Sequence, residues 1–197
     1  NSIQAGANNV ELLGAEEEEF VNKRKSSHIK QVAVLDDGHG MTEEVLHLAL
    51  QFGNGTHLDE SKDELGIGKF GIGLPNSSIS QCRRVDVWSW QNGSKNAIHT
   101  YIDIDEIQGK KQVAVPAPKE KPIPEIWLEV GNTFEKTGTL VVWSKLDRCL
   151  WKTASTLMEH SELITGRTYR KFLDKGRVSI RFVSFDVEKP ENSIEEE

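Results

Sequence analysis

The sequence feature that most constrains the fold is a glycine-rich segment, Gly66-Ile67-Gly68-Lys69-Phe70-Gly71-Ile72-Gly73, which opens a predicted helix over residues 72–82. Glycines let the backbone approach an anion, and the free N–H groups at a helix start attract phosphate. A charged stretch, Asp59–Leu65, precedes the segment where a dinucleotide site needs a buried strand. Lys69 is followed by Phe70, where a Walker A loop needs Ser or Thr. The segment therefore predicts a phosphate site of another kind, unless it is only a turn.

A second motif, Asp36-Asp37-Gly38-His39-Gly40-Met41, follows the stretch Ile29–Leu35, which is rich in β-branched residues and predicts a strand. A carboxylate at a strand end can accept a hydrogen bond from an exocyclic amine, and a site built around such a bond rejects bases that lack the donor. The alternative is an Asp-Gly turn that joins the strand to a helix. The motif alone does not decide between the two interpretations.

The remaining pattern mixes helices with strands. Thr42 is a predicted N-cap for a helix that ends at Gly53 or Gly55, and a polar loop continues to Leu65. Residues 153–173 are predicted to be helical, with Gly166 as a potential break. The other predicted strands cover residues 85–90, 97–104, 112–115, 126–130, 139–143 and 178–185. The order of elements predicts an α/β two-layer sandwich, with a mostly antiparallel sheet covered by helices on one face.

Composition and apolar patterning indicate neither a nucleic-acid nor a membrane partner. The net charge of −7 and the isoelectric point near 5.5 do not indicate a nucleic-acid-binding face on this domain. The longest apolar stretches, such as Val32–Leu35, are far shorter than the ~20 residues of a bilayer span, so no membrane partner is expected. We expect a cytoplasmic protein, or a nuclear one if the source is eukaryotic.

Four motifs in a fixed order resemble the GHKL ATPases, the family of gyrase, the ninety-kilodalton heat-shock chaperones, histidine kinases and MutL. Asn1-Ser2-Ile3-Gln4-Ala5-Gly6-Ala7 is similar to the family's N-box, and the motif at Asp36 is similar to its adenine motif. Gly68-x-x-Gly71-x-Gly73 and Thr137-Gly138-Thr139 are similar to the two that follow. The stretch Lys69–Arg84 is closest to the microrchidia and chaperone branch. The resemblance implies a Bergerat-type fold that binds ATP and Mg²⁺.

The resemblance also implies roles for individual residues. Asn1 would coordinate Mg²⁺, and Asp36 would accept the adenine amino proton beside Gly38. Gly40 and Met41 would lie against the adenine ring, and Thr139 would complete the water-bridged contact with adenine. Residues 53–67 would form the lid. The phosphates would be bound by the backbone of the glycine-rich box, with the charge of Lys69 beside it: Gly68, Lys69, Phe70, Gly71, Ile72 and Gly73.

The sequence departs from the family pattern at two points. Gln4 stands where many relatives have Asp. The family's general base is a Glu, sometimes an Asp, one helical turn before the N-box Asn, and Asn1 opens the chain. We therefore expect a preceding segment that carries the base, and little ATP binding and no turnover by the 197-residue chain alone.

The predicted organisation has three parts. Residues 1–150 form the nucleotide-binding domain, with its first helix truncated; residues 151–187 add a helix and a strand; residues 188–197 are an acidic tail or linker. We expect Mg·ATP binding and, in the full-length protein, hydrolysis that drives lid closure and nucleotide-dependent homodimerisation. The alternative is a nucleotide-gated interaction module, in which ATP is a conformational clamp with little or no turnover. A histidine-kinase catalytic domain is a weaker third possibility, since no phospho-acceptor hairpin is visible.

Overall fold

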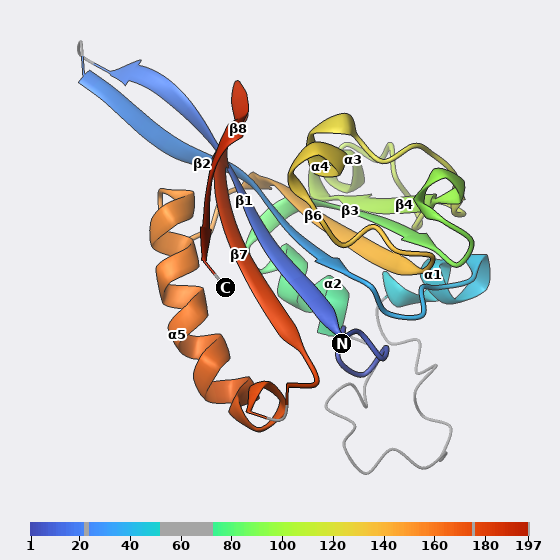
Figure 1. Ribbon diagram of the computed structural model, residues 1–197. Helices are drawn as coiled ribbons and strands as arrows, with labels where there is room; N and C mark the ends of the chain where they lie inside the picture. The colour runs from blue at the N-terminus through green and yellow to red at the C-terminus, as the bar shows by residue number, and fades with distance from the viewer. Residues whose placement is uncertain (22–23, 52–72, 175, 197) are drawn as a thin grey trace.

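The computed structural model describes residues 1–21, 24–51, 73–174 and 176–196 (Figure 1). The helices are α1 (Glu43–Ala49), α2 (Gly73–Ile79), α3 (Ile104–Gln108), α4 (Glu125–Val130) and α5 (Ala154–Leu173), with a 3₁₀ turn η1 (Ser94–Asn96). The strands are β1 (Asn9–Val21), β2 (Arg24–Asp36), β3 (Cys82–Trp90), β4 (Ile98–Asp103), β5 (Lys119–Glu120), β6 (Gly138–Leu146), β7 (Ser179–Asp186) and β8 (Lys189–Glu196).

The strands of the described residues form one sheet in the order β5-β4-β3-β6-β2-β1-β7-β8. Among these, β1 and β7 pair in parallel and the other neighbours are antiparallel. The expected α/β class with a mostly antiparallel sheet is therefore confirmed. None of the helices in the described ranges is long and apolar enough to cross a membrane.

Strand periodicity divides the core between the two faces of the sheet. On one face Leu46 of α1, Leu50 just beyond it and Ile79 of α2 pack against alternate residues of β3, β4 and β6. Leu157 and Met158 of α5 pack on the same face. Helices cover this face, as predicted.

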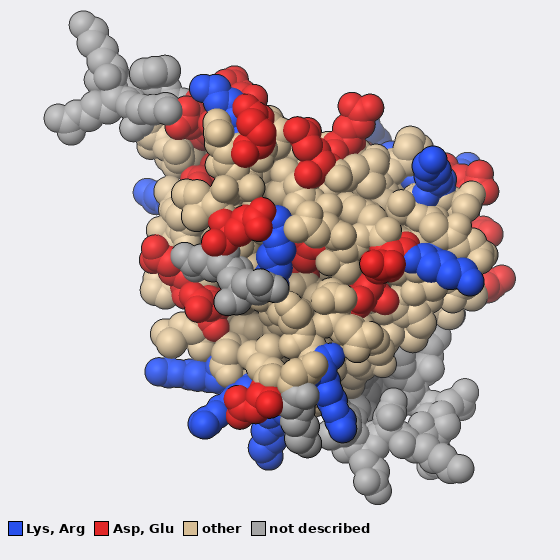
Figure 2. All heavy atoms as spheres, in the orientation of Figure 1, with Lys and Arg blue, Asp and Glu red and all other residues tan. Residues whose placement is uncertain are grey.

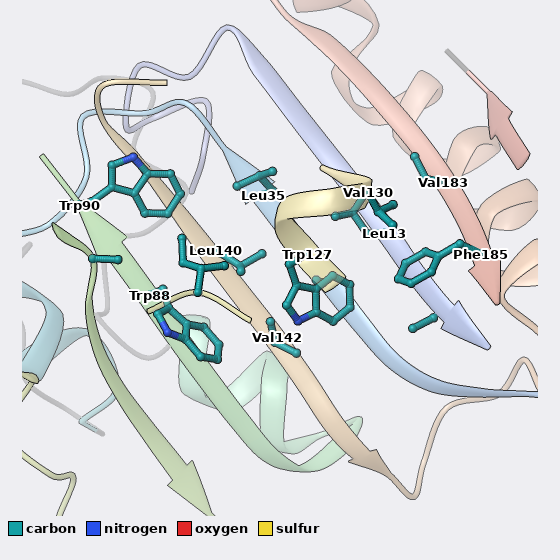
Figure 3. Close-up of a cluster of buried hydrophobic side chains, with 14 residues drawn as sticks. Leu13, Leu35, Trp88, Trp90, Trp127, Val130, Leu140, Val142, Val183 and Phe185 are labelled. Atoms are coloured by element: carbon teal, nitrogen blue, oxygen red, sulfur yellow. The ribbon is translucent and has the colours of Figure 1, made fainter. Parts of the chain in front are cut away.

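The opposite face carries the largest cluster of aromatic side chains. Trp127 and Val130 are three positions apart in α4, so both side chains lie on the side of the helix that faces the sheet. They pack against residues of five strands (Figure 3), among them Leu13, Leu35, Trp88, Trp90, Leu140, Val142, Val183 and Phe185. The sheet is thus covered on this face too, by a short helix and its flanking chain.

Two predicted helices are present, as α1 and α5, although the end of α1 differs from the prediction. The Thr42 hydroxyl accepts a hydrogen bond from the Val45 N–H at the start of α1, as its N-cap position predicts. Helix α5 is unbroken at Gly166. Helix α1 ends at Ala49, earlier than the predicted stop.

Three local predictions were wrong. Residues 126–130 were expected to be a strand and form α4, because a short apolar run does not distinguish the two structures. Residues 112–115 lie in no strand. The acidic segment 188–197 was expected to be a tail, yet its residues 189–196 pair with β7 as β8. The sequence analysis also missed the strand over residues 9–21, which is β1.

Candidate functional site

Asp36 is the last residue of β2, and its side chain lies on the face covered by α1 and α2. Only 7% of its surface is exposed. The Ser2 hydroxyl donates to Oδ2 at 2.7 Å, and the Gly38 N–H donates to Oδ1 at 3.0 Å. Burial raises the pKa of the Asp36 carboxyl, although these two hydrogen bonds act in the opposite direction. A buried carboxylate with two fixed partners keeps further lone pairs for a ligand.

Two hydroxyl groups continue the polar row across the sheet. Thr139 of β6 is the cross-strand neighbour of Asp36, and Ser89 of β3 is the cross-strand neighbour of Thr139. Both hydroxyls lie on the same face as Asp36, because the three residues are paired side by side. Ser89 is fully buried and its Oγ lies 3.0 Å from Thr139 Oγ1.

The turn after Asp36 is fixed against β3 by close backbone packing. Gly40 has a φ of +68°, and a Cβ there would lie 2.1 Å from the Trp90 carbonyl oxygen. The Met41 N–H donates to Ser89 Oγ at 2.8 Å. A Cβ at Gly138 would lie 2.5 Å from the Asp36 carbonyl oxygen. The glycines of both motifs are therefore required by space, and Gly40 also by its backbone conformation.

The N-terminal segment folds into turns that pack beside this site. The Ala5 N–H donates to the Asn1 carbonyl oxygen at 2.9 Å, and the His39 N–H donates to the Ala5 carbonyl oxygen at 2.9 Å. Asp37 accepts hydrogen bonds from the backbone N–H groups of Asn8 and Asn9, so it anchors this segment.

Asn1 and Gly73 are 72 positions apart in sequence and adjacent in space. A Cβ built on Gly73 would lie 3.9 Å from Asn1 Nδ2. The start of the N-box motif and the end of the glycine-rich box therefore meet at the first residue of α2.

The structure brings together the described members of the predicted site around the ends of β2, β6 and β3: Asn1, Asp36, Gly38, Gly40, Met41, Gly73 and Thr139. Residues 68–72 of the phosphate box, including Lys69, lie outside the described residues, as do residues 53–67 of the predicted lid. Ser89 was missed by the sequence analysis. The alternation in Val85-Asp86-Val87-Trp88-Ser89 places it on the face of Val85 and Val87, which was the available signal.

Residues 1–137 match the family model described as "Histidine kinase-, DNA gyrase B-, and HSP90-like ATPase". This chain belongs to that family, and membership implies that it binds ATP. The branch within the family is not resolved by this match.

One similar solved structure is described as the "Crystal Structure of N terminal domain of a DNA repair protein". Sequence identity is 14% and the TM-score is 0.47, over all of this chain and 47% of that one. The chain thus spans about half the length of that structure. No curated protein matches the sequence.

Proposed function

We propose that this chain binds Mg·ATP at the ends of β2, β6 and β3, with Asp36 accepting a hydrogen bond from the adenine amino group. We further propose that the full-length protein hydrolyses ATP to close residues 53–67 over the nucleotide and to form a homodimer. The motifs at Lys69–Arg84 favour the microrchidia and chaperone branch of the family.

The observation that carries the proposal is the buried carboxylate of Asp36. Its two hydrogen-bond partners, Ser2 and Gly38, leave both oxygens with unused lone pairs beside the Thr139 hydroxyl. Burying a charge is costly without partners, so such an acceptor is best explained by a ligand that donates to it. Close packing at Gly40 and Gly138 keeps side chains out of the adjacent space.

The Asn1 carboxamide fits a Mg²⁺ ion bound together with phosphates. Mg²⁺ prefers oxygen ligands and is commonly held by one or two protein groups together with substrate phosphates. The Asn1 carboxamide lies beside Gly73, the last residue of the predicted phosphate box, and its oxygen would be the ligand. Bound there, the ion would neutralise phosphate charge. Asn1 would hold it, and the backbone at Gly73 would leave room for the phosphates.

The first test is nucleotide binding by the full-length protein, measured by calorimetry. We expect ATP to bind more tightly than GTP, because guanine places a carbonyl oxygen where adenine has its amino group. Asp36→Asn should weaken ATP binding by about 1–3 kcal/mol, the cost of a mismatched buried hydrogen bond. Equal affinities for ATP and GTP, or an unaffected variant, would show that Asp36 is not the base-recognition residue.

Turnover is tested separately, by steady-state phosphate release with Mg²⁺ and with EDTA. Phosphate release that requires Mg²⁺ would support the proposal that the full-length protein is an ATPase. Tight ATP binding without phosphate release would instead identify a nucleotide-gated interaction module.

A further inference from the structure

Ser89 takes part in three hydrogen bonds with only one proton of its own. The Met41 N–H donates to Ser89 Oγ at 2.8 Å, and the Gly138 carbonyl oxygen lies 3.0 Å from the same Oγ. Thr139 Oγ1 is the third neighbour, also at 3.0 Å. The residue is fully buried, so water does not complete these bonds.

The chemistry of the three neighbours fixes the direction of each bond. A serine hydroxyl has one proton and two lone pairs. The amide of Met41 can only donate, and the carbonyl of Gly138 can only accept. The Ser89 proton therefore goes to Gly138, and Thr139 must donate to the second lone pair of Ser89. If Ser89 donated to Thr139 instead, two oxygens would lie 3.0 Å apart at Gly138 with no proton between them.

Because the Thr139 hydroxyl proton points to Ser89, this hydroxyl presents only lone pairs on the side away from Ser89. Because Thr139 and Asp36 are cross-strand neighbours on one face, their Cβ atoms lie about 5 Å apart. A ligand group held by Asp36 is therefore within reach of Thr139, directly or through one water. Both side chains then present acceptors, and neither presents a proton.

We infer that Ser89 is a positioning residue, which orients the Thr139 hydroxyl so that the base-binding wall contains acceptors only and selects a purine with a 6-amino group. The inference rests on the proposed function and extends it from one selective residue to a three-strand network. A ligand with a 6-carbonyl group would meet lone pairs from both Asp36 and Thr139.

The test compares ATP with ITP, which carries a carbonyl oxygen in place of the 6-amino group. Affinities are measured by calorimetry with the full-length protein. In Ser89→Ala the Thr139 proton is released and can turn toward a 6-carbonyl group. We expect the ATP-to-ITP affinity ratio to fall about tenfold, the equivalent of one hydrogen bond of about 1.4 kcal/mol.

Two further variants separate this role from ordinary packing. Ser78 is a matched control: it is a fully buried serine of α2, and its Oγ accepts a hydrogen bond from Trp143 Nε1 at 2.8 Å. Ser78→Ala should lower stability and leave the ratio unchanged. In a Thr139→Val background, Ser89→Ala should no longer change the ratio, because the proton that it releases is gone.

The outcomes are distinguishable. If the unaltered protein does not bind ATP, the proposed function fails. If it prefers ATP to ITP and Ser89→Ala keeps the full ratio, the function stands and the inference is overturned. Should Ser89→Ala not fold, Ser89→Cys retains the volume with weaker hydrogen bonds, and its ratio must still fall for the inference to hold.

Discussion

Asp36 is held at the end of β2 by Ser2 from the N-terminal turns and by Gly38 from its own turn. In the protein without ligand this arrangement is unfavourable, because burial raises the pKa of the carboxyl above its usual range. The same burial strengthens any hydrogen bond that a ligand donates to it. The burial of Asp36 therefore lowers the stability of the ligand-free protein and strengthens the recognition of a ligand.

Asp36→Asn should raise the melting temperature measured without nucleotide at pH 8. A carboxyl whose pKa is raised by folding contributes stability that is complete below its unfolded pKa, about 3.9, and is lost as pH rises through the folded pKa. The neutral amide removes that loss, so the gain from the substitution should be larger at pH 8 than at pH 4. A thermal melting series over this range checks it. A variant that melts lower than the original protein at pH 8 would contradict the burial argument.

The site was predictable to the extent that its residues lie in local motifs. Asp36, Gly38 and Gly40 belong to one turn, and the structure gives each glycine a close neighbour. Ser89 has no motif of its own. The alternation in β3 indicates which face Ser89 lies on, but its part in the site depends on the pairing register of β3 with β6, which joins residues 50 positions apart.

At the scale of the elements, β8 shows how tertiary pairing overrides composition. Residues 188–197 are rich in acidic side chains, which is typical of a solvated tail. In the structure β7 supplies a free edge, and Phe182, Val183 and Ser184 pair with Glu196, Glu195 and Ile194. Backbone pairing with β7 and the ion pair between Arg181 and Glu195 stabilise β8, although its acidic composition does not favour a strand.

Helix α5 is positioned on the sheet by one glycine of β1. A Cβ at Gly14 would lie 2.7 Å from Ala154 Cβ and 2.7 Å from Met158 Cε. Gly14→Val should therefore push the first turn of α5 from the sheet, at a cost of roughly 1–3 kcal/mol or more by urea unfolding. Gly166→Ala is the control within α5, because a Cβ there meets nothing within 4 Å. It should stabilise by up to ~1 kcal/mol. Equal effects would show that α5 is not fixed at Gly14.

At the scale of the whole molecule, charge is unevenly distributed. The chain has 31 acidic and 24 basic side chains, yet Arg167, Arg170 and Lys171 lie in the last two turns of α5, with Arg177 just beyond. Figure 2 shows basic side chains gathered around the end of the molecule where α5 finishes in Figure 1. Cations at this end of a helix offset the partial negative charge of its unpaired carbonyl groups.

One buried ion pair connects distant parts of the chain. Glu11 of β1 is 1% exposed and bonds to Arg181 of β7, and its Oε1 accepts from the Asn132 N–H at 2.9 Å. Glu11→Ala should cost up to about 3–5 kcal/mol by urea unfolding, because Arg181 loses its buried partner and keeps only the half-exposed Glu195. The exposed pair between Lys30 and Glu17 is the control, and Glu17→Ala should change stability by less than ~1 kcal/mol. Comparable losses in the two variants would mean that Glu11 contributes no more to the free energy of unfolding than an exposed charge does.

The parallel pairing of β1 with β7 has a consequence during protein synthesis. Asn9 pairs with Ser179, so a ribosome adding ~5–20 residues per second makes the second strand roughly 10–30 seconds after the first. In that interval the edge of β1 that later pairs with β7 has no partner, and an unpaired strand edge is a site for aggregation. Glu11 and Glu16 place charge along that edge. We expect nascent chains stalled before Ser179 to remain dispersed and to aggregate once Glu11 and Glu16 are both made alanine, as sedimentation of stalled ribosome complexes would reveal.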